Sequence, residues 1–252
     1  MKKKIAVSLK NINKTFRIRT AGEKTIRERI TNLLTRKRSI IKHIHALHAI
    51  NVDIYKGESF GIIGNNGCGK STLLNIIMET YKPDKGGQVI SEGRMMRLAL
   101  GLGIDPNLTA RDNIYVNGTI IGLPFKKIGK VFSQIIDFAG IEEFIDTPVK
   151  FYSKGMKQRL MFSIAMHAEA DIFLLDEFFG GTGDQDFKAK SDKAFQDRII
   201  DGKTNIIVSH SMAIIKKHCH RALWIHKGRI KMIGDVNDVI NAYSSSTKPK
   251  AQ

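Results

Sequence analysis

The sequence contains little cysteine, little acidic charge and no long apolar run. Two cysteines in 252 residues cannot form a disulfide framework, which excludes small disulfide-rich secreted folds and fits a reducing compartment. No run of about 18 apolar residues occurs, so we expect no membrane-spanning helix. The basic start at residues 1–4 is not followed by a long apolar stretch, so we expect no secretory signal.

Acidic residues are scarcest in the first fifty positions. This part holds 14 lysines and arginines against two glutamates, a net charge of +12, whereas the remaining chain carries only +5 of the total +17. Such an asymmetry suggests an acidic neighbour, which would be anionic lipid, nucleic acid or an acidic protein face. A solvated basic face explains the same charge, and both interpretations stay open.

The length and the apolar content of 42% suffice for one large α/β domain with an inserted subdomain. We expect that subdomain to be helical and to occupy about residues 105–168, because the apolar spacing there is helical.

One stretch fits the phosphate-binding loop pattern G-x-x-x-x-G-K-[ST]. It consists of Gly64, Asn65, Asn66, Gly67, Cys68, Gly69, Lys70, Ser71 and Thr72. An apolar run at residues 59–63 predicts a buried strand before it, and residues 73–78 predict a helix after it. The three glycines allow the backbone to wrap around phosphates where a Cβ would clash, and backbone N–H groups at a helix start bind anions. We expect Lys70 to reach the β- and γ-phosphates and Ser71 to bind Mg²⁺, whereas Cys68 is a small packing residue.

Two later strands are expected to end in polar groups. Residues 171–177 form an apolar run that ends in Asp176, an expected Mg²⁺ ligand, and Glu177, which would polarise the attacking water. Residues 204–210 form another run, whose final His210 is a candidate γ-phosphate contact. Phe16 follows a short expected strand at residues 6–9 and is either a base-stacking residue or part of the core.

Residues 20–46 predict a basic amphipathic helix or helix pair. Residues 25–28 have the form of a capping box, and apolar residues then recur at helical spacing up to Ile44. This segment would either pack its apolar stripe on the domain or lie near a membrane surface or membrane partner.

Residues 152–160, Tyr-Ser-Lys-Gly-Met-Lys-Gln-Arg-Leu, resemble the signature of ATP-binding cassette (ABC) ATPases, usually Leu-Ser-Gly-Gly-Gln. Ser153 and Gly155 match it, whereas Lys154 and Met156 depart from it. The form Tyr-Ser-x-Gly-Met is similar to the subfamily that energises export of lipid-linked polysaccharides. Residues 106–114 and 222–230 also resemble that subfamily, and the resemblance covers about residues 5–243.

The resemblance implies one ABC ATPase domain over residues 1–252, with a RecA-like P-loop NTPase core, a β subdomain and the helical subdomain. It implies ATP and Mg²⁺ as cofactors and a head-to-tail homodimer, in which Ser153, Lys154, Gly155 and Met156 close on the nucleotide of the other subunit. Glu177, His210 and Lys70 would be catalytic, and Asp184 would lie in the dimer loop. The Gln that usually senses Mg²⁺ is missing from residues 97–101.

The implied function is ATP hydrolysis that drives export of a lipid-linked glycan, O-antigen first, with capsule or teichoic acid as alternatives. The partner would be a separate polytopic permease that handles the glycan, and the chain would lie peripherally at the cytoplasmic face of the inner membrane. No carbohydrate-binding domain is expected after Tyr243. A soluble ABC ATPase acting on nucleic acid or ribosomes is the rival hypothesis. We expect no nucleic-acid partner, because paired cassettes and long coiled coils are missing from the sequence.

Overall fold

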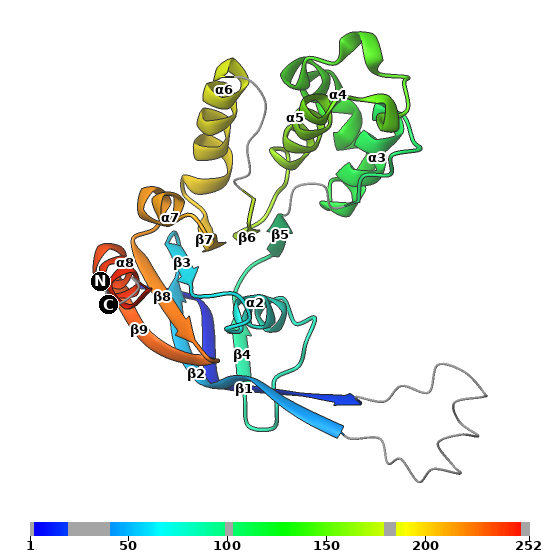
Figure 1. Cartoon of the computed structure of the whole chain (residues 1–252). Helices are drawn as coiled ribbons and strands as arrows, with labels where there is room; N and C mark the ends of the chain where they lie inside the picture. Colours follow the sequence, from blue (N-terminus) through cyan, green and yellow to red (C-terminus); the bar gives the residue numbers. More distant parts are fainter. Residues whose placement is uncertain (1–2, 20–40, 99–102, 179–184, 248–252) are drawn as a thin grey trace, which may run out of the picture.

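The computed structural model describes residues 3–19, 41–98, 103–178 and 185–247, which form two sheets and their covering helices (Figure 1). The strands are β1 (Ile5–Arg19), β2 (Ile41–Tyr55), β3 (Ser59–Ile63), β4 (Gln88–Ser91), β5 (Met95–Leu98), β6 (Ile172–Asp176), β7 (Thr204–Val208), β8 (Arg221–His226) and β9 (Arg229–Asp235). The α-helices are α2 (Lys70–Ile77), α3 (Ala110–Ile120), α4 (Phe125–Ala139), α5 (Lys154–Ala165), α6 (Gln185–Phe195), α7 (Met212–His218) and α8 (Val236–Thr247). Short helical turns occupy Glu142–Phe144, Val149–Phe151 and Gln196–Ile200.

The larger sheet has the strand order β5-β6-β7-β3-β8-β9, and its strands run parallel except for β9, which is antiparallel to β8. Strands β3 and β7 are buried at every position, because helices or the second sheet cover both of their faces. Burial on both faces explains why these strands read as continuous apolar runs. Since β3, β6 and β7 are parallel, their carboxyl ends lie at one edge of the sheet.

Helix α2 packs between the larger sheet and a smaller antiparallel sheet of order β2-β1-β4 (Figure 1). Its side chains Leu73, Leu74, Ile76 and Ile77 join one apolar cluster with residues of β1, β2, β3 and β6. A second apolar cluster covers the other face of the larger sheet and includes Phe173 and Leu175 of β6. The helix that follows the phosphate-loop motif is therefore fixed on both sides.

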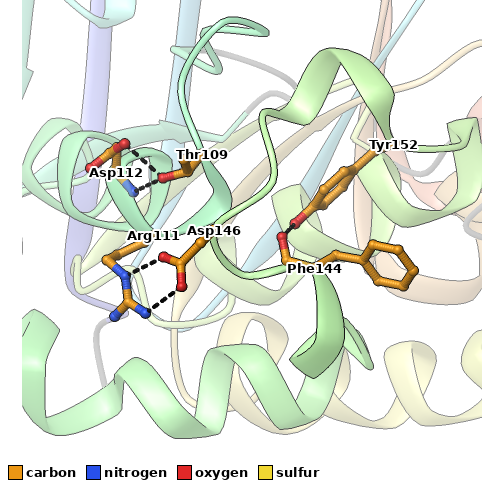
Figure 2. Close-up of polar contacts among 6 residues, drawn as sticks. All are labelled: Thr109, Arg111, Asp112, Phe144, Asp146 and Tyr152. Atoms are coloured by element: carbon orange, nitrogen blue, oxygen red, sulfur yellow. Dashed lines mark hydrogen bonds and ion pairs between the residues drawn. The ribbon is translucent and has the colours of Figure 1, made fainter.

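Helices α3, α4 and α5 pack around an apolar cluster of their own, which includes Ile114, Ile135 and Leu160, and lie at one end of the molecule (Figure 1). Thr109 caps α3, because its Oγ1 accepts from Asp112 N at 3.1 Å and donates to the Asp112 carboxylate at 2.6 Å (Figure 2). Arg111 binds Asp146 with two hydrogen bonds and holds the pKa of that carboxyl below its usual value. The motif at residues 106–114 therefore has a structural role in this helical part.

The structure confirms most of the expected elements and corrects two. The strand expected at residues 6–9 is the start of the longer β1, so Phe16 lies inside a strand and not after one. Residues 41–46 belong to β2 and not to a helix, since Ile44 pairs with Phe16 and His45 with Thr15. The expected helix at residues 20–40 lies outside the described residues. No helix in the described ranges has the length and apolar character needed to cross a bilayer.

His167, just after α5, generates a prediction on acid stability. Burial, followed by the nearby Arg198 and Lys127, lowers the pKa of His167 from 6.5 to about 4. The unfolded chain therefore takes up a proton between these values that the folded chain does not, and the stabilisation present above about pH 6.5 is lost as the pH falls toward 4. Since the imidazole is only partly buried, we expect a loss of about 1 kcal/mol.

We predict that His167→Gln reduces the loss of unfolding free energy between pH 7.5 and pH 5, because glutamine takes up no proton. Denaturant titrations at the two pH values measure this, and His226→Gln at an exposed position is the matched control. An equal loss in the wild type and in His167→Gln would contradict the assignment.

Candidate functional site

A cavity of about 710 Å³ opens at the carboxyl edge of the larger sheet. It is lined by Phe16, Ile44, His45, Ala46, His48, Asn66, Gly67, Gly69, Lys70, Ser71, Thr72, Asp176, Glu177, Val208, His210, Lys227 and Gly228. The structure thus brings the phosphate-loop residues together with the polar ends of β6 and β7. The smaller sheet contributes the opposite wall.

The backbone angles and close contacts of the phosphate-loop motif explain why its glycines are needed. Gly64, Gly67 and Gly69 have φ values of 149°, 72° and 114°, which glycine adopts more readily than any other residue. A Cβ at Gly64 would lie 2.3 Å from the Ile225 carbonyl oxygen, and one at Gly69 would lie 2.7 Å from that of Ala46. No atom lies within 4 Å of a Cβ at Gly67, so its backbone angle alone explains that glycine.

Lys70 supplies a positive charge at the floor of the cavity. Its buried side chain donates from Nζ to the carbonyl oxygens of Gly64 at 2.7 Å and Asn65 at 3.1 Å. Neither acceptor is charged, so the ammonium keeps its full charge. Helix α2 begins at Lys70 without a side-chain cap, and its first N–H groups are therefore free to bind an anion. This donor set fits the phosphates of a nucleotide.

Cys68 and Asn65 connect the phosphate loop to the C-terminal part of the chain. Cys68 is buried, as expected for a packing residue, and its carbonyl accepts from Gly228 N at 2.9 Å. The Asn65 side chain accepts from the Tyr243 hydroxyl of α8 at 2.8 Å. These contacts join residues far apart in the sequence, and no local pattern predicts them.

Asp176, Glu177 and His210 line the same cavity as the phosphate-loop residues. Glu177 Oε1 is 2.8 Å from His210 Nε2, and both side chains are more than half exposed. Glu177 has a φ of 50°, a left-handed angle that is unusual for a residue with a side chain and is often found at functional sites. A carboxylate beside an imidazole can orient or deprotonate a water molecule.

The oxygen atoms of Asp176 and Ser71 are suitable ligands for Mg²⁺. Among the described residues, no group of three or more histidine, cysteine, aspartate or glutamate side chains could hold a metal ion. The pair of Asp176 and Ser71 fits a cation that arrives with the nucleotide, because Mg²⁺ is usually held by one or two carboxylates together with substrate phosphates.

Arg97 is a residue of this region that the sequence did not predict. Its Nη2 donates to Asp176 Oδ2 at 2.5 Å, and its Nη1 donates to Asn75 Oδ1 at 3.2 Å. Arg97 lies on β5, next to β6, so this contact depends on the pairing of two strands distant in the sequence. The stretch from which the Mg²⁺-sensing Gln is missing, residues 97–101, continues into residues 99–102, which lie outside the described residues.

Phe16 lies on the cavity wall and is accompanied by a second aromatic ring. The rings of Phe16 and Tyr81 meet edge to face with centroids 5.6 Å apart, and Lys14 Nζ lies 5.5 Å from the Phe16 centroid. His45 and His48 stack nearby, and burial lowers the pKa of His48, which favours its neutral form. A half-buried Phe16 at the rim could stack on a base.

The signature stretch lies at the start of α5 (Figure 1), and none of its residues lines this cavity. Ser153 is the exposed N-cap of α5, and its side chain accepts a hydrogen bond from Met156 N at 3.1 Å. The preceding residue, Tyr152, is held by its hydroxyl, which donates to Phe144 O (Figure 2). Lys154 is exposed, a Cβ at Gly155 would lie 3.9 Å from Ser153 Oγ, and Met156 packs against the helical cluster. Asp184 lies outside the described residues.

The chain is 38% identical over 242 residues to an O-antigen export system ATP-binding protein of Myxococcus xanthus, covering 94% of this chain and 55% of that protein. It is 39% identical over 204 residues to a teichoic acids export ATP-binding protein of Bacillus anthracis, covering 81% of this chain and 37% of that protein. The chain therefore spans only about half, or less, of the length of these curated relatives.

A solved dimeric ATP-binding cassette, bound to ADP and Pi in a post-hydrolysis state, has a similar fold. The TM-score is 0.66 at 23% identity, and the match covers 91% of this chain and 98% of that one. The pattern of the ABC transporter family matches residues 47–180, which include the phosphate-loop motif, the signature stretch and the end of β6. The chain belongs to the ABC transporter family.

Proposed function

We propose that this chain is the ATP-hydrolysing subunit of an ABC transporter that exports a lipid-linked polysaccharide. The main support for ATP hydrolysis is the cavity that is lined by the phosphate loop together with Asp176, Glu177 and His210. The identity to O-antigen and teichoic acid export proteins over most of the chain supports polysaccharide as the exported class. O-antigen is our first choice of substrate, and teichoic acid or capsule is the alternative.

In the proposed mechanism, ATP binds with its phosphates against the N-terminus of α2. Lys70 lies where it offsets phosphate charge, and Phe16 stacks on the base. Ser71 and Asp176 would hold Mg²⁺, whose chemistry is to neutralise charge that develops on the phosphates. These assignments use side chains that line one cavity.

Hydrolysis then requires a water molecule held in line with the γ-phosphate. Glu177 orients this water and accepts its proton, and His210 contacts the γ-phosphate while it fixes the Glu177 carboxylate at 2.8 Å. Both side chains line the cavity and are more than half exposed, which leaves room for a nucleotide and water beside them.

A second copy of the chain completes the site. Ser153 and Lys154 at the N-terminus of α5 are exposed and do not line the cavity of their own chain, so this helix start is accessible to another subunit's nucleotide. A head-to-tail homodimer with two ATP molecules at its interface satisfies this arrangement, and the solved cassette with a similar fold is also dimeric.

The membrane partner is a separate polytopic permease that handles the glycan. We place the subunit peripherally at the cytoplasmic face of the inner membrane, with the part of the basic segment that precedes β2, residues 20–40, toward the permease or the lipid headgroups. The dense positive charge of the first fifty residues supports this orientation, because each lysine or arginine near an anionic surface contributes about 1 kcal/mol.

Replacing Glu177 tests hydrolysis and export together. We predict that Glu177→Gln keeps nucleotide affinity but lowers the ATPase rate by about two orders of magnitude or more, because the water loses its proton acceptor. In the native host, the same variant should stop surface display of the polysaccharide while lipid-linked glycan accumulates inside. Near-normal turnover would remove Glu177 from catalysis. Normal display of every surface polysaccharide would contradict the export function.

Assembly is tested with a variant of the signature stretch. We predict that ATP and Mg²⁺ shift Glu177→Gln toward a dimer, and that adding Ser153→Arg blocks the shift, because a bulky cation would replace the cap at the interface. Light scattering with and without ATP measures the change, and Ser245→Arg at an exposed position of α8 is the matched control. Normal dimerisation of the Ser153→Arg variant would exclude the stretch from the interface.

A further inference from the structure

Arg97 occupies an oxygen atom of the carboxylate that the proposed site uses for Mg²⁺. Its Nη2 lies 2.5 Å from Asp176 Oδ2, and the two side chains are 35% and 17% exposed. A guanidinium so close to a carboxylate competes with any other cation for the same lone pairs. Asp176 is therefore held in an ion pair that must change if a cation approaches this oxygen.

The second anchor of Arg97 lies on the helix that carries the other candidate ligand. Asn75, whose Oδ1 accepts from Arg97 Nη1 at 3.2 Å, stands one helical turn after Ser71 on α2. Arg97 thus bridges β5, the end of β6 and α2, which are the elements around the proposed metal site. The hydrogen bonding of its guanidinium is incomplete, because the buried Nε has no hydrogen-bond partner within the described part of the chain.

Arg97 also lies between two cavities. Asp176 lines the nucleotide cavity, whereas Arg97 itself lines a second cavity of about 350 Å³. That cavity is walled by β5, by Met78 after α2, and by Ile120 and Ile164 of the helical part. The second cavity provides room for the arginine side chain when it leaves Asp176. Replacement of Arg97 by a cation at Asp176 would therefore change the contacts of Arg97 beside the helical part.

We propose that Arg97 is a positioning residue that pairs with Asp176 in the metal-free protein and releases it when Mg²⁺ arrives with a nucleotide. Arg97 thereby lowers the apparent affinity for Mg²⁺ and repositions at the border of the helical part when the cation binds. This inference rests on the proposed function, since it takes Asp176 as a ligand of Mg²⁺.

The size of the effect follows from the fraction of molecules in which Asp176 is free. If the ion pair is formed in about nine of ten molecules, the apparent affinity for the cation is lowered about tenfold. Removing the guanidinium should recover this factor. Binding of Mg²⁺ and of the nucleotide are thermodynamically linked, so the factor by which Mg²⁺ raises nucleotide affinity should change by the same tenfold amount.

The experiment measures binding of a fluorescent ADP analogue in EDTA and in saturating Mg²⁺, and the ratio of the two affinities is the readout. We expect Arg97→Met to raise this ratio about tenfold, the factor set by the occupied fraction. Arg94→Met is the matched control, because it removes the same charge from a nearby arginine that binds the Gly122 carbonyl instead. It should leave the ratio unchanged.

A double-mutant cycle separates the pair from a general structural effect. Asp176→Asn should lower the ratio, and Arg97→Met should have no further effect in that background. If Arg97→Met does not bind the analogue in EDTA because it fails to fold, Asn75→Ala, which removes only the second anchor, should raise the ratio by a smaller factor.

The outcomes are distinct. An unchanged or lowered ratio in Arg97→Met, with a lowered ratio in Asp176→Asn, overturns the role of Arg97 and leaves the metal site standing. A ratio that Asp176→Asn does not change overturns the metal role of Asp176, and the inference falls with it. A raised ratio in Arg97→Met that persists in the Asp176→Asn background also overturns the pairing.

Discussion

The site depends on the parallel pairing of β3, β7 and β6. In this register Ile62 of β3 and Asp176 of β6 both stand beside Val208 of β7, so the three strands end at the same level. The phosphate loop leaves β3 at this level, and Glu177 and His210 follow β6 and β7. A shift of one strand would separate these side chains although each would keep its local structure. Parallel pairing needs both faces of the sheet covered, and α2 together with the smaller sheet provides one of the covers.

The second requirement is an excess of hydrogen-bond donors and positive charge on one wall of the cavity. The ammonium of Lys70 and the uncapped start of α2 line the same cavity as the carboxylates of Asp176 and Glu177. The donors suit a phosphate chain and the carboxylates suit its cation, because each binds the part of opposite charge. Helix α2 packs between two sheets, which keeps these donors in place.

The sequence predicted what local patterns encode. The strands at residues 59–63, 172–176 and 204–208 are recognisable because they are short apolar runs, and the phosphate-loop motif has a fixed spacing. Residues 41–46 were misassigned, since apolar residues three apart also occur in a strand whose partner, β1, lies far away in the sequence. The contact of Arg97 with Asp176 could not be predicted, because it needs the pairing of β5 with β6. The same holds for Tyr81 beside Phe16.

The central claim is that each catalytic site joins the phosphate loop of one subunit to the signature stretch of another. The most direct test mixes two inactive variants, Lys70→Met and Ser153→Arg, and measures ATP hydrolysis. Each variant alone loses both sites of its homodimer, whereas a mixed dimer has one site with an intact phosphate loop and an intact signature stretch. The account predicts that the mixture regains hydrolysis that neither variant shows alone. A mixture no more active than its separate components would contradict the account.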